Sequence, residues 1–190
     1  MSSVAVPMHT PVLLMGPVKS GKTSALIREA VRFQVRGLKI ITIKHSIDFR
    51  EHDARGLLKS RDGTQLSNNV VADTLSYADM APDLPEAAVL AIDEGQFFGD
   101  SLVPFVEEAT QRGHRVMVAA LNGDFRREPF ACIAILAARS HVHCLAAICQ
   151  RCGNDAVHSK KIGGNSQQVI EVDSAGVSYE PRCTNCHPLD

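Results

Sequence analysis

The stretch GPVKSGKT, Gly16 to Thr23, decides the fold of this chain. It fits the phosphate-binding pattern G-x-x-x-x-G-K-[ST]. The apolar run 11–15 ahead of it predicts a buried strand, and the segment 22–36 behind it predicts a helix. The glycines let the backbone turn its N–H groups around a polyphosphate, and the helix N-terminus adds positive partial charge there. The sequence therefore predicts a nucleotide-binding loop, in which Lys22 contacts the β- and γ-phosphates and Thr23 ligates Mg²⁺.

Apolar strands and amphipathic helices alternate along the chain as far as residue 148. The nearly continuous apolar content of LKIITIK, at 38–44, is typical of a strand buried on both faces. Further strands are expected at 70–71, 87–92, 115–121 and 143–148, and further helices at 102–112 and 131–139. This alternation predicts an α/β fold with a mostly parallel sheet and right-handed crossovers. Ligands then bind at the carboxyl ends of the strands.

Composition and charge narrow the partners and the cellular location that we expect for this protein. The chain has 190 residues, 45% of them hydrophobic, and a net charge of −1. The balanced charge gives no general attraction to nucleic acid or anionic membranes, so we expect neither as a partner. No apolar stretch reaches the ~18 residues that a membrane span needs, and residues 1–10 lack the order of a signal peptide. We expect a cytoplasmic protein without disulfides, in which residues 1–10 are a short disordered lead-in.

An acidic pair, Asp93-Glu94, ends the apolar strand AVLAIDE. An acidic residue at this place is the usual companion of a phosphate loop and holds Mg²⁺ directly or through water. The carboxylate of Glu94 can accept a proton from an attacking hydroxyl, unless it is only a surface residue at a strand end. If the hydroxyl belongs to water, the protein is a nucleoside triphosphatase; if it belongs to a small alcohol, the protein is a kinase.

Four of the six cysteines form two C-x-x-C pairs, Cys149 with Cys152 and Cys183 with Cys186. Two such pairs are typical of a closed, tetrahedral Zn²⁺ site with a structural role. A redox motif is the competing interpretation, but it needs one pair only. His187 adjoins the second pair and is an alternative ligand.

The character of the sequence changes at residue 149, after which glycine, serine and polar residues dominate. We therefore expect a P-loop domain over residues 11–148 and a small zinc-binding domain over residues 149–190. The remaining two cysteines, Cys132 and Cys144, lie in apolar elements and are expected to be small core residues.

Several motifs follow one another in a fixed order: GPVKSGKT, KHSIDFR, IDEGQFF, ALNGDFRREPF, C-x-x-C and YEPRC-x-x-C. This order resembles that of the type II thymidine kinases, the zinc-containing cytosolic family, over about residues 11–187. The resemblance implies a RecA-like P-loop domain and a zinc domain that carries a lasso loop. It also implies transfer of the γ-phosphate of ATP to the 5′-hydroxyl of thymidine. A homotetramer and inhibition by thymidine triphosphate are further implications.

The resemblance also implies a role for each site residue. Glu94 matches the catalytic base, and the four paired cysteines match the zinc ligands. The residues that match ATP and magnesium binding are Gly16, Pro17, Val18, Lys19, Ser20, Gly21, Lys22, Thr23, Asp48, Arg50, Asp93 and Gln96. The residues that match thymidine binding are Phe97, Leu121, Phe125, Ile170, Glu171, Val172, Asp173, Ser174 and Tyr179.

The chain departs from the family pattern at several positions. In the phosphate loop, Val18-Lys19 replaces the family's Met-Phe. Further along, Asn122 replaces an aspartate and Ala131 replaces a glycine. In the lasso, Ser174-Ala175 replaces the family's Gly-Gly. If the lasso requires a positive φ at the second of its glycines, Ala175 would resist it.

Two other functions fit parts of the sequence. Asp-Glu-x-Gln after a strand also suits a P-loop ATPase that acts on nucleic acid, and the lasso departures suit a catalytically weak nucleotide-binding relative. A nucleic-acid motor usually needs a second RecA-like domain or an arginine from a neighbouring subunit, whereas this chain has room for one domain of that kind. Dependence of ATP turnover on nucleosides distinguishes these functions.

Overall fold

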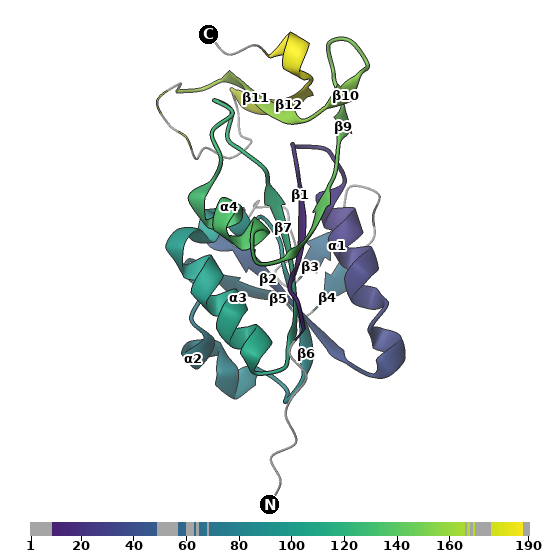
Figure 1. Ribbon diagram of the computed structural model, residues 1–190, viewed down its shortest axis with the longest axis vertical. Coiled ribbons are helices and arrows are strands. Elements are labelled where there is room, and N and C mark those ends of the chain that lie inside the picture. Colours follow the sequence, from purple (N-terminus) through teal and green to yellow (C-terminus); the bar gives the residue numbers. More distant parts are fainter. Residues whose placement is uncertain are drawn as a thin grey trace, which may run out of the picture.

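Six strands form the central sheet in Figure 1, which shows a computed structural model of the chain. The structure describes residues 9–48, 57–59, 63, 65–67, 69–165, 167, 169 and 176–187. The strands are β1 (Val12–Gly16), β2 (Lys39–His45), β5 (Asn69–Ala72), β6 (Ala88–Ile92), β7 (Arg115–Leu121) and β8 (His141–Cys144). Their order is β5-β2-β6-β7-β1-β8, and every neighbouring pair is parallel. The predicted α/β fold with a mostly parallel sheet is thus confirmed.

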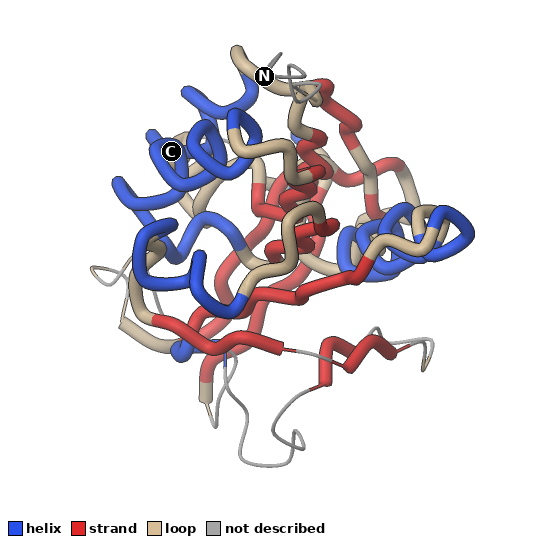
Figure 2. Tube along the Cα trace, turned by 90° about the horizontal axis from the view of Figure 1, so that it is seen from below, coloured by secondary structure: helices blue, strands red, loops and turns tan. Residues whose placement is uncertain are grey.

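Helices cover both faces of this sheet (Figures 1 and 2). The helices are α1 (Lys22–Val31), α2 (Tyr77–Met80), α3 (Leu102–Gln111) and α4 (Ala131–Ala137), with 3₁₀ turns η1 (Gln34–Arg36), η2 (Ser46–Asp48), η3 (Ala81–Asp83) and η4 (Gly95–Ser101). One apolar cluster joins the sheet to α3 and α4. A second joins the opposite face to α1 and to the hairpin of β3 (Leu57–Lys59) and β4 (Gln65–Ser67). The sheet is therefore buried between two layers, as its apolar strands predict.

A group of short elements lies beyond one end of the sheet, at the top of Figure 1. We call it the cysteine segment, residues 147–187. It contains β9 (Ala147–Ile148), β10 (Asp155–Ala156), β11 (His158–Gly163), β12 (Val177–Arg182) and the turn η5 (Thr184–Cys186). Its buried residues form a separate small cluster of Ala147, Cys149, Ala156 and Cys183. The predicted division into two domains at residue 148 stays a prediction, and the predicted lead-in lies outside the described residues except for 9–10.

The helix predicted at 22–36 ends earlier, at Val31. The chain then tightens into η1: the N–H of Phe33 donates an i→i+3 hydrogen bond to the carbonyl of Ala30 at the end of α1, and the N–H groups of Arg36 and Gly37 continue this pattern. Gly37 closes this turn with φ 75°, in the left-handed region that favours glycine. The strand predicted at 143–148 is likewise divided between β8 and β9, because the apolar pattern does not reveal where the chain leaves the sheet.

The expectation that Cys144 is a core residue is wrong. Cys144 is exposed, whereas Cys132 is buried as expected. The reason is the position of β8, which pairs only with β1 and so forms an edge of the sheet. His141 and His143 on the same strand are exposed as well. Among the described helices, none combines the length and the apolar character that crossing a bilayer requires.

His114 lies just ahead of β7, at the end of the sheet away from the phosphate loop. It is 2% exposed, and its Nε2 atom shares a hydrogen bond of 2.7 Å with the hydroxyl of Tyr77. Its Nδ1 atom is buried and has no hydrogen-bond partner among the residues that the structure describes. Burial lowers the pKa of His114 below its usual value of 6.5, because desolvation penalises the charged imidazolium.

This burial predicts a pH dependence of stability. The lowered pKa means that the unfolded chain binds more protons at His114 than the folded chain does as the pH falls. The stabilisation is present above about pH 6.5 and is lost as the pH falls below it. We expect the wild type to lose more free energy of unfolding than His114→Gln between about pH 7.5 and pH 5, measured by urea denaturation. Glutamine can still bond to Tyr77 but does not titrate, so parallel curves for the two proteins would contradict the prediction.

Candidate active site

The phosphate loop connects β1 to α1, as the sequence predicts. Gly16 has no room for a side chain, because a Cβ atom there would lie 2.3 Å from the carbonyl oxygen of Leu145. Gly21 has φ 82°, in the left-handed region. Lys19 also has a positive φ of 62°, which strains a residue with a side chain. The loop thus needs both of its glycines and is strained at Lys19.

Lys22 folds back onto this loop. Its side chain is buried, and its ammonium group donates a hydrogen bond of 2.8 Å to the carbonyl oxygen of Pro17. The backbone N–H of Ser20 donates to the same oxygen at 3.4 Å. The Ser20 hydroxyl is buried, and the described part of the chain offers it no hydrogen-bond partner. The lysine is therefore anchored by the loop in which the motif assigns it to the β- and γ-phosphates.

Thr23 at the start of α1 contacts Asp93 at the end of β6. Its hydroxyl donates to the Asp93 carboxylate, with O···O distances of 3.0 and 3.3 Å. Asp93 is 4% exposed, and its backbone N–H donates to Ile43 of the neighbouring strand β2. A hydroxyl and a carboxylate are oxygen donors of the kind that Mg²⁺ prefers, so these two residues fit a magnesium ion.

Glu94 follows Asp93 in a left-handed conformation, with φ 50° and ψ 44°. Its side chain is partly buried, and its Oε2 atom accepts a hydrogen bond of 2.6 Å from Nε2 of Gln96. Gln96 is 2% exposed, and its Oε1 atom accepts a bond of 3.0 Å from the backbone N–H of Leu121. Gln96 therefore joins the Glu94 carboxylate to the end of β7, which fixes its position.

Phe125 projects from a turn that Asp124 organises. One oxygen of the Asp124 carboxylate accepts hydrogen bonds from the backbone N–H groups of Arg126 and Glu128, at 2.8 and 2.9 Å. The ammonium of Lys161 lies 5.1 Å from the centre of the Phe125 ring, within reach of a cation–π interaction. The sequence analysis missed Asp124, although aspartate near a glycine is a common signal for such a turn.

The remaining matched residues are only partly described. Tyr179 on β12 pairs with Lys161 on β11, and the ring of Phe97 lies edge-on to His45, 6.0 Å away. The side chain of Asp48 and the whole of Arg50 lie outside the described residues. The described residues also leave out a run of six in the predicted lasso: Ile170, Glu171, Val172, Asp173, Ser174 and Ala175.

The sulfur atoms of Cys149, Cys152, Cys183 and Cys186 all lie within 4.8 Å of one another. Zn–S bonds of about 2.3 Å in a tetrahedron place sulfurs about 3.8 Å apart, so the four thiols fit a Zn²⁺ ion. Hydrogen bonds within the cluster move the pKa values of its thiols apart: desolvation opposes ionisation of Cys149, but backbone hydrogen bonds outweigh it and lower its pKa to about 6, whereas side-chain hydrogen bonds with Cys152 and Cys183 raise the pKa of Cys186 to about 12. A thiolate is the form that binds a metal. The predicted clustering of the four cysteines is thus confirmed.

His187 does not join this cluster. Its Nε2 atom donates a hydrogen bond of 2.9 Å to the carbonyl oxygen of Phe125. Its own carbonyl oxygen accepts a bond of 3.3 Å from the guanidinium of Arg127. His187 therefore links the second cysteine pair to the turn of Phe125. Its position beside Cys186 in the sequence did not indicate this role.

The cysteine segment contacts the other two loops of the site as well. The hydroxyl of Ser159 accepts a hydrogen bond of 3.0 Å from the backbone N–H of Val18 in the phosphate loop. The side-chain amide of Asn122 donates a bond of 2.9 Å to the carbonyl oxygen of Val157. The family's aspartate at position 122 has no donor when it is ionised, so this departure adds a contact. Ser159 carries no motif, and sequence reasoning did not identify it.

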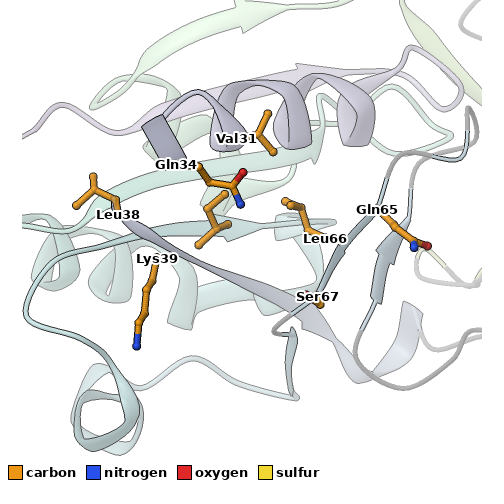
Figure 3. A pocket seen from close by; sticks show the side chains of 8 residues that line it. Val31, Gln34, Leu38, Lys39, Gln65, Leu66 and Ser67 are labelled. Carbon is orange, nitrogen blue, oxygen red and sulfur yellow. The ribbon is translucent and has the colours of Figure 1, made fainter. Parts of the chain in front are cut away.

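A cavity of about 480 Å³ lies away from these groups, between the end of α1 and β4 (Figure 3). Its lining includes Lys39 at the amino end of β2, whereas the phosphate loop and Asp93 follow the carboxyl ends of their strands. This cavity therefore does not belong to the candidate site.

Comparison with known proteins adds the family. The sequence profile described as thymidine kinase matches residues 10–187. Thymidine kinases of monkeypox virus (strain Zaire-96-I-16), vaccinia virus (strain Ankara) and variola virus are each 36% identical to this chain over 181 residues. The alignments cover 92% of this chain and 94% of each relative. The matched range includes the phosphate loop, the acidic pair and both cysteine pairs, and the chain belongs to the thymidine kinase family.

Proposed function

We propose that this protein is a thymidine kinase that transfers the γ-phosphate of ATP to the 5′-hydroxyl of thymidine. The family supports the substrates, and one observation carries the chemistry. The Glu94 carboxylate is held by Gln96 directly after Asp93, which in turn accepts a hydrogen bond from Thr23 of the phosphate loop. A proton acceptor and a triphosphate-binding loop are thus next to each other.

In the proposed reaction the 5′-oxygen of the nucleoside attacks the γ-phosphorus of ATP. The new bond joins that oxygen to the γ-phosphorus, and the bond from the γ-phosphorus to the β–γ bridging oxygen breaks, so that ADP leaves. The hydroxyl proton passes to the carboxylate of Glu94 and then to solvent. Lys22 and the backbone N–H groups of the loop bind the phosphates. Because little covalent chemistry falls to the protein, its main contributions are orientation and charge stabilisation.

Two metal ions are part of the proposal. Thr23 and Asp93 would hold Mg²⁺, which neutralises charge on the β- and γ-phosphates. A structural Zn²⁺ ion would keep the cysteine segment folded, and its ligands would be Cys149, Cys152, Cys183 and Cys186. The thymine base is proposed to be surrounded by Phe97, Leu121, Phe125, Tyr179 and the segment 170–174. We further propose a cytoplasmic homotetramer that thymidine triphosphate inhibits, as the family resemblance implies.

The identity of the phosphate acceptor can be tested directly. We expect ATP consumption with Mg²⁺ to depend on thymidine and to yield thymidine monophosphate, measured by separating the products of a nucleoside panel. Because a motor hydrolyses ATP with water as the acceptor, ATP turnover that ignores nucleosides but rises with DNA would contradict the proposal.

Glu94→Gln tests the proton acceptor. The amide keeps the size of the side chain and an oxygen that can still bond to Gln96, but it cannot accept the proton. We expect kcat to fall by about two to four orders of magnitude while ATP binding is retained. The matched control is Glu86→Gln, an exposed residue near the amino end of the same strand, which should leave kcat unchanged. Near-normal turnover in Glu94→Gln would remove Glu94 as the base.

Removal of zinc tests the structural role of the four cysteines. The bonds from Asn122 to Val157 and from His187 to Phe125 connect the cysteine segment to loops proposed to lie around the base. Chelation should therefore raise the KM for thymidine and release one Zn²⁺ ion per chain, measured by kinetics and by elemental analysis. An unchanged KM after complete loss of the metal would show that the metal site and the base pocket are independent.

A further inference from the structure

We propose that Ser159 is a positioning residue for the phosphate loop, through which the cysteine segment tunes the affinity for ATP. The proposal rests on the ATP binding of the proposed function but not on the identity of the acceptor. It assigns a role to a side chain 141 residues away from the loop in the sequence.

The contact is partly buried. Ser159 lies on β11, is 2% exposed, and accepts a hydrogen bond of 3.0 Å from the backbone N–H of Val18, a residue of intermediate burial. A partly buried N–H group that loses its partner destabilises the conformation that shields it from water. The bond therefore favours one orientation of the peptide group that contains this N–H.

That peptide group has a second bond on its other side. The N–H of Val18 and the carbonyl of Pro17 belong to the same planar peptide unit, so they rotate together. The Pro17 oxygen accepts a hydrogen bond of 2.8 Å from the ammonium of Lys22. By fixing the N–H, Ser159 also fixes the direction of the carbonyl on which Lys22 rests. The hydroxyl of Ser159 thus acts on the phosphate-binding lysine through one peptide group.

The cysteine segment holds Ser159 in place. Ser159 lies opposite Pro181 in the antiparallel pair of β11 and β12. The carbonyl oxygen of Pro181 accepts a hydrogen bond of 3.1 Å from the backbone N–H of Gln150, which follows the metal-site residue Cys149. β12 ends one residue after Pro181, at Arg182, and leads directly to Cys183. The hydroxyl is therefore carried by a strand anchored beside the four thiols, not by a free loop.

The test is binding of a non-hydrolysable ATP analogue with Mg²⁺, measured by calorimetry without nucleoside. Ser159→Ala removes only the hydroxyl, and we expect its Kd to be about three- to tenfold higher than that of the wild type, as the loss of one partly buried hydrogen bond predicts. Ser159→Thr keeps a hydroxyl and should bind within about twofold of the wild type. In steady-state kinetics the KM for ATP should rise in Ser159→Ala, with kcat changed less than KM.

Ser178→Ala is the matched control, because Ser178 is an exposed serine on the partner strand β12. Its Kd should equal that of the wild type. The proposal is overturned if Ser159→Ala binds as tightly as the wild type, or if Ser159→Thr or Ser178→Ala is weakened to the same extent. Because no nucleoside is present, a failure here leaves the proposed acceptor untouched. Conversely, a kinase that ignores thymidine but shows this pattern of Kd values would overturn only the proposed function.

Discussion

The hydrogen bond from Thr23 to Asp93 is the constraint on which the site depends. It joins the first turn of α1 to the end of β6 through two residues that are 70 positions apart in the sequence. Parallel strands make this meeting possible, because the carboxyl ends of β1 and β6 lie at the same edge of the sheet. Glu94, the proposed proton acceptor, is the residue that follows Asp93, so it lies directly beside this junction.

The cysteine segment provides the second level of organisation. Its buried cluster has four residues, and two of them are cysteines. The Zn²⁺ ion proposed above would stabilise this segment as a hydrophobic core stabilises the sheet. The segment in turn contacts the phosphate loop, the end of β7 and the turn of Phe125 through Ser159, Val157 and His187. Hydrogen bonds between side chains and backbone thus connect the four-cysteine cluster to the phosphate loop, to the end of β7 and to the turn of Phe125.

The sequence predicts those features that have a local pattern. Periodicity gives the strands and helices, and the motifs give Lys22, Thr23, Asp93 and the four cysteines, because their chemistry requires fixed spacings. The exposure of Cys144 could not be predicted, since an edge strand and a central strand can have the same apolar pattern. The contact of Ser159 with Val18 could not be predicted either, because a single serine in a polar hairpin has no signal for a partner 141 residues away. Long-range partners follow from the packing of whole elements, which local patterns do not encode.

The conformation of Glu94 has a consequence for how this protein can change. A left-handed backbone costs a residue with a side chain on the order of 1–2 kcal/mol, whereas glycine adopts it without penalty. Stability alone would therefore favour glycine at position 94, but glycine cannot accept a proton. The fold tolerates a small loss of stability at the position of the proposed proton acceptor. Selection for heat resistance without selection for turnover would act against this glutamate, so thermostability and the proposed role of Glu94 are opposed at a single residue.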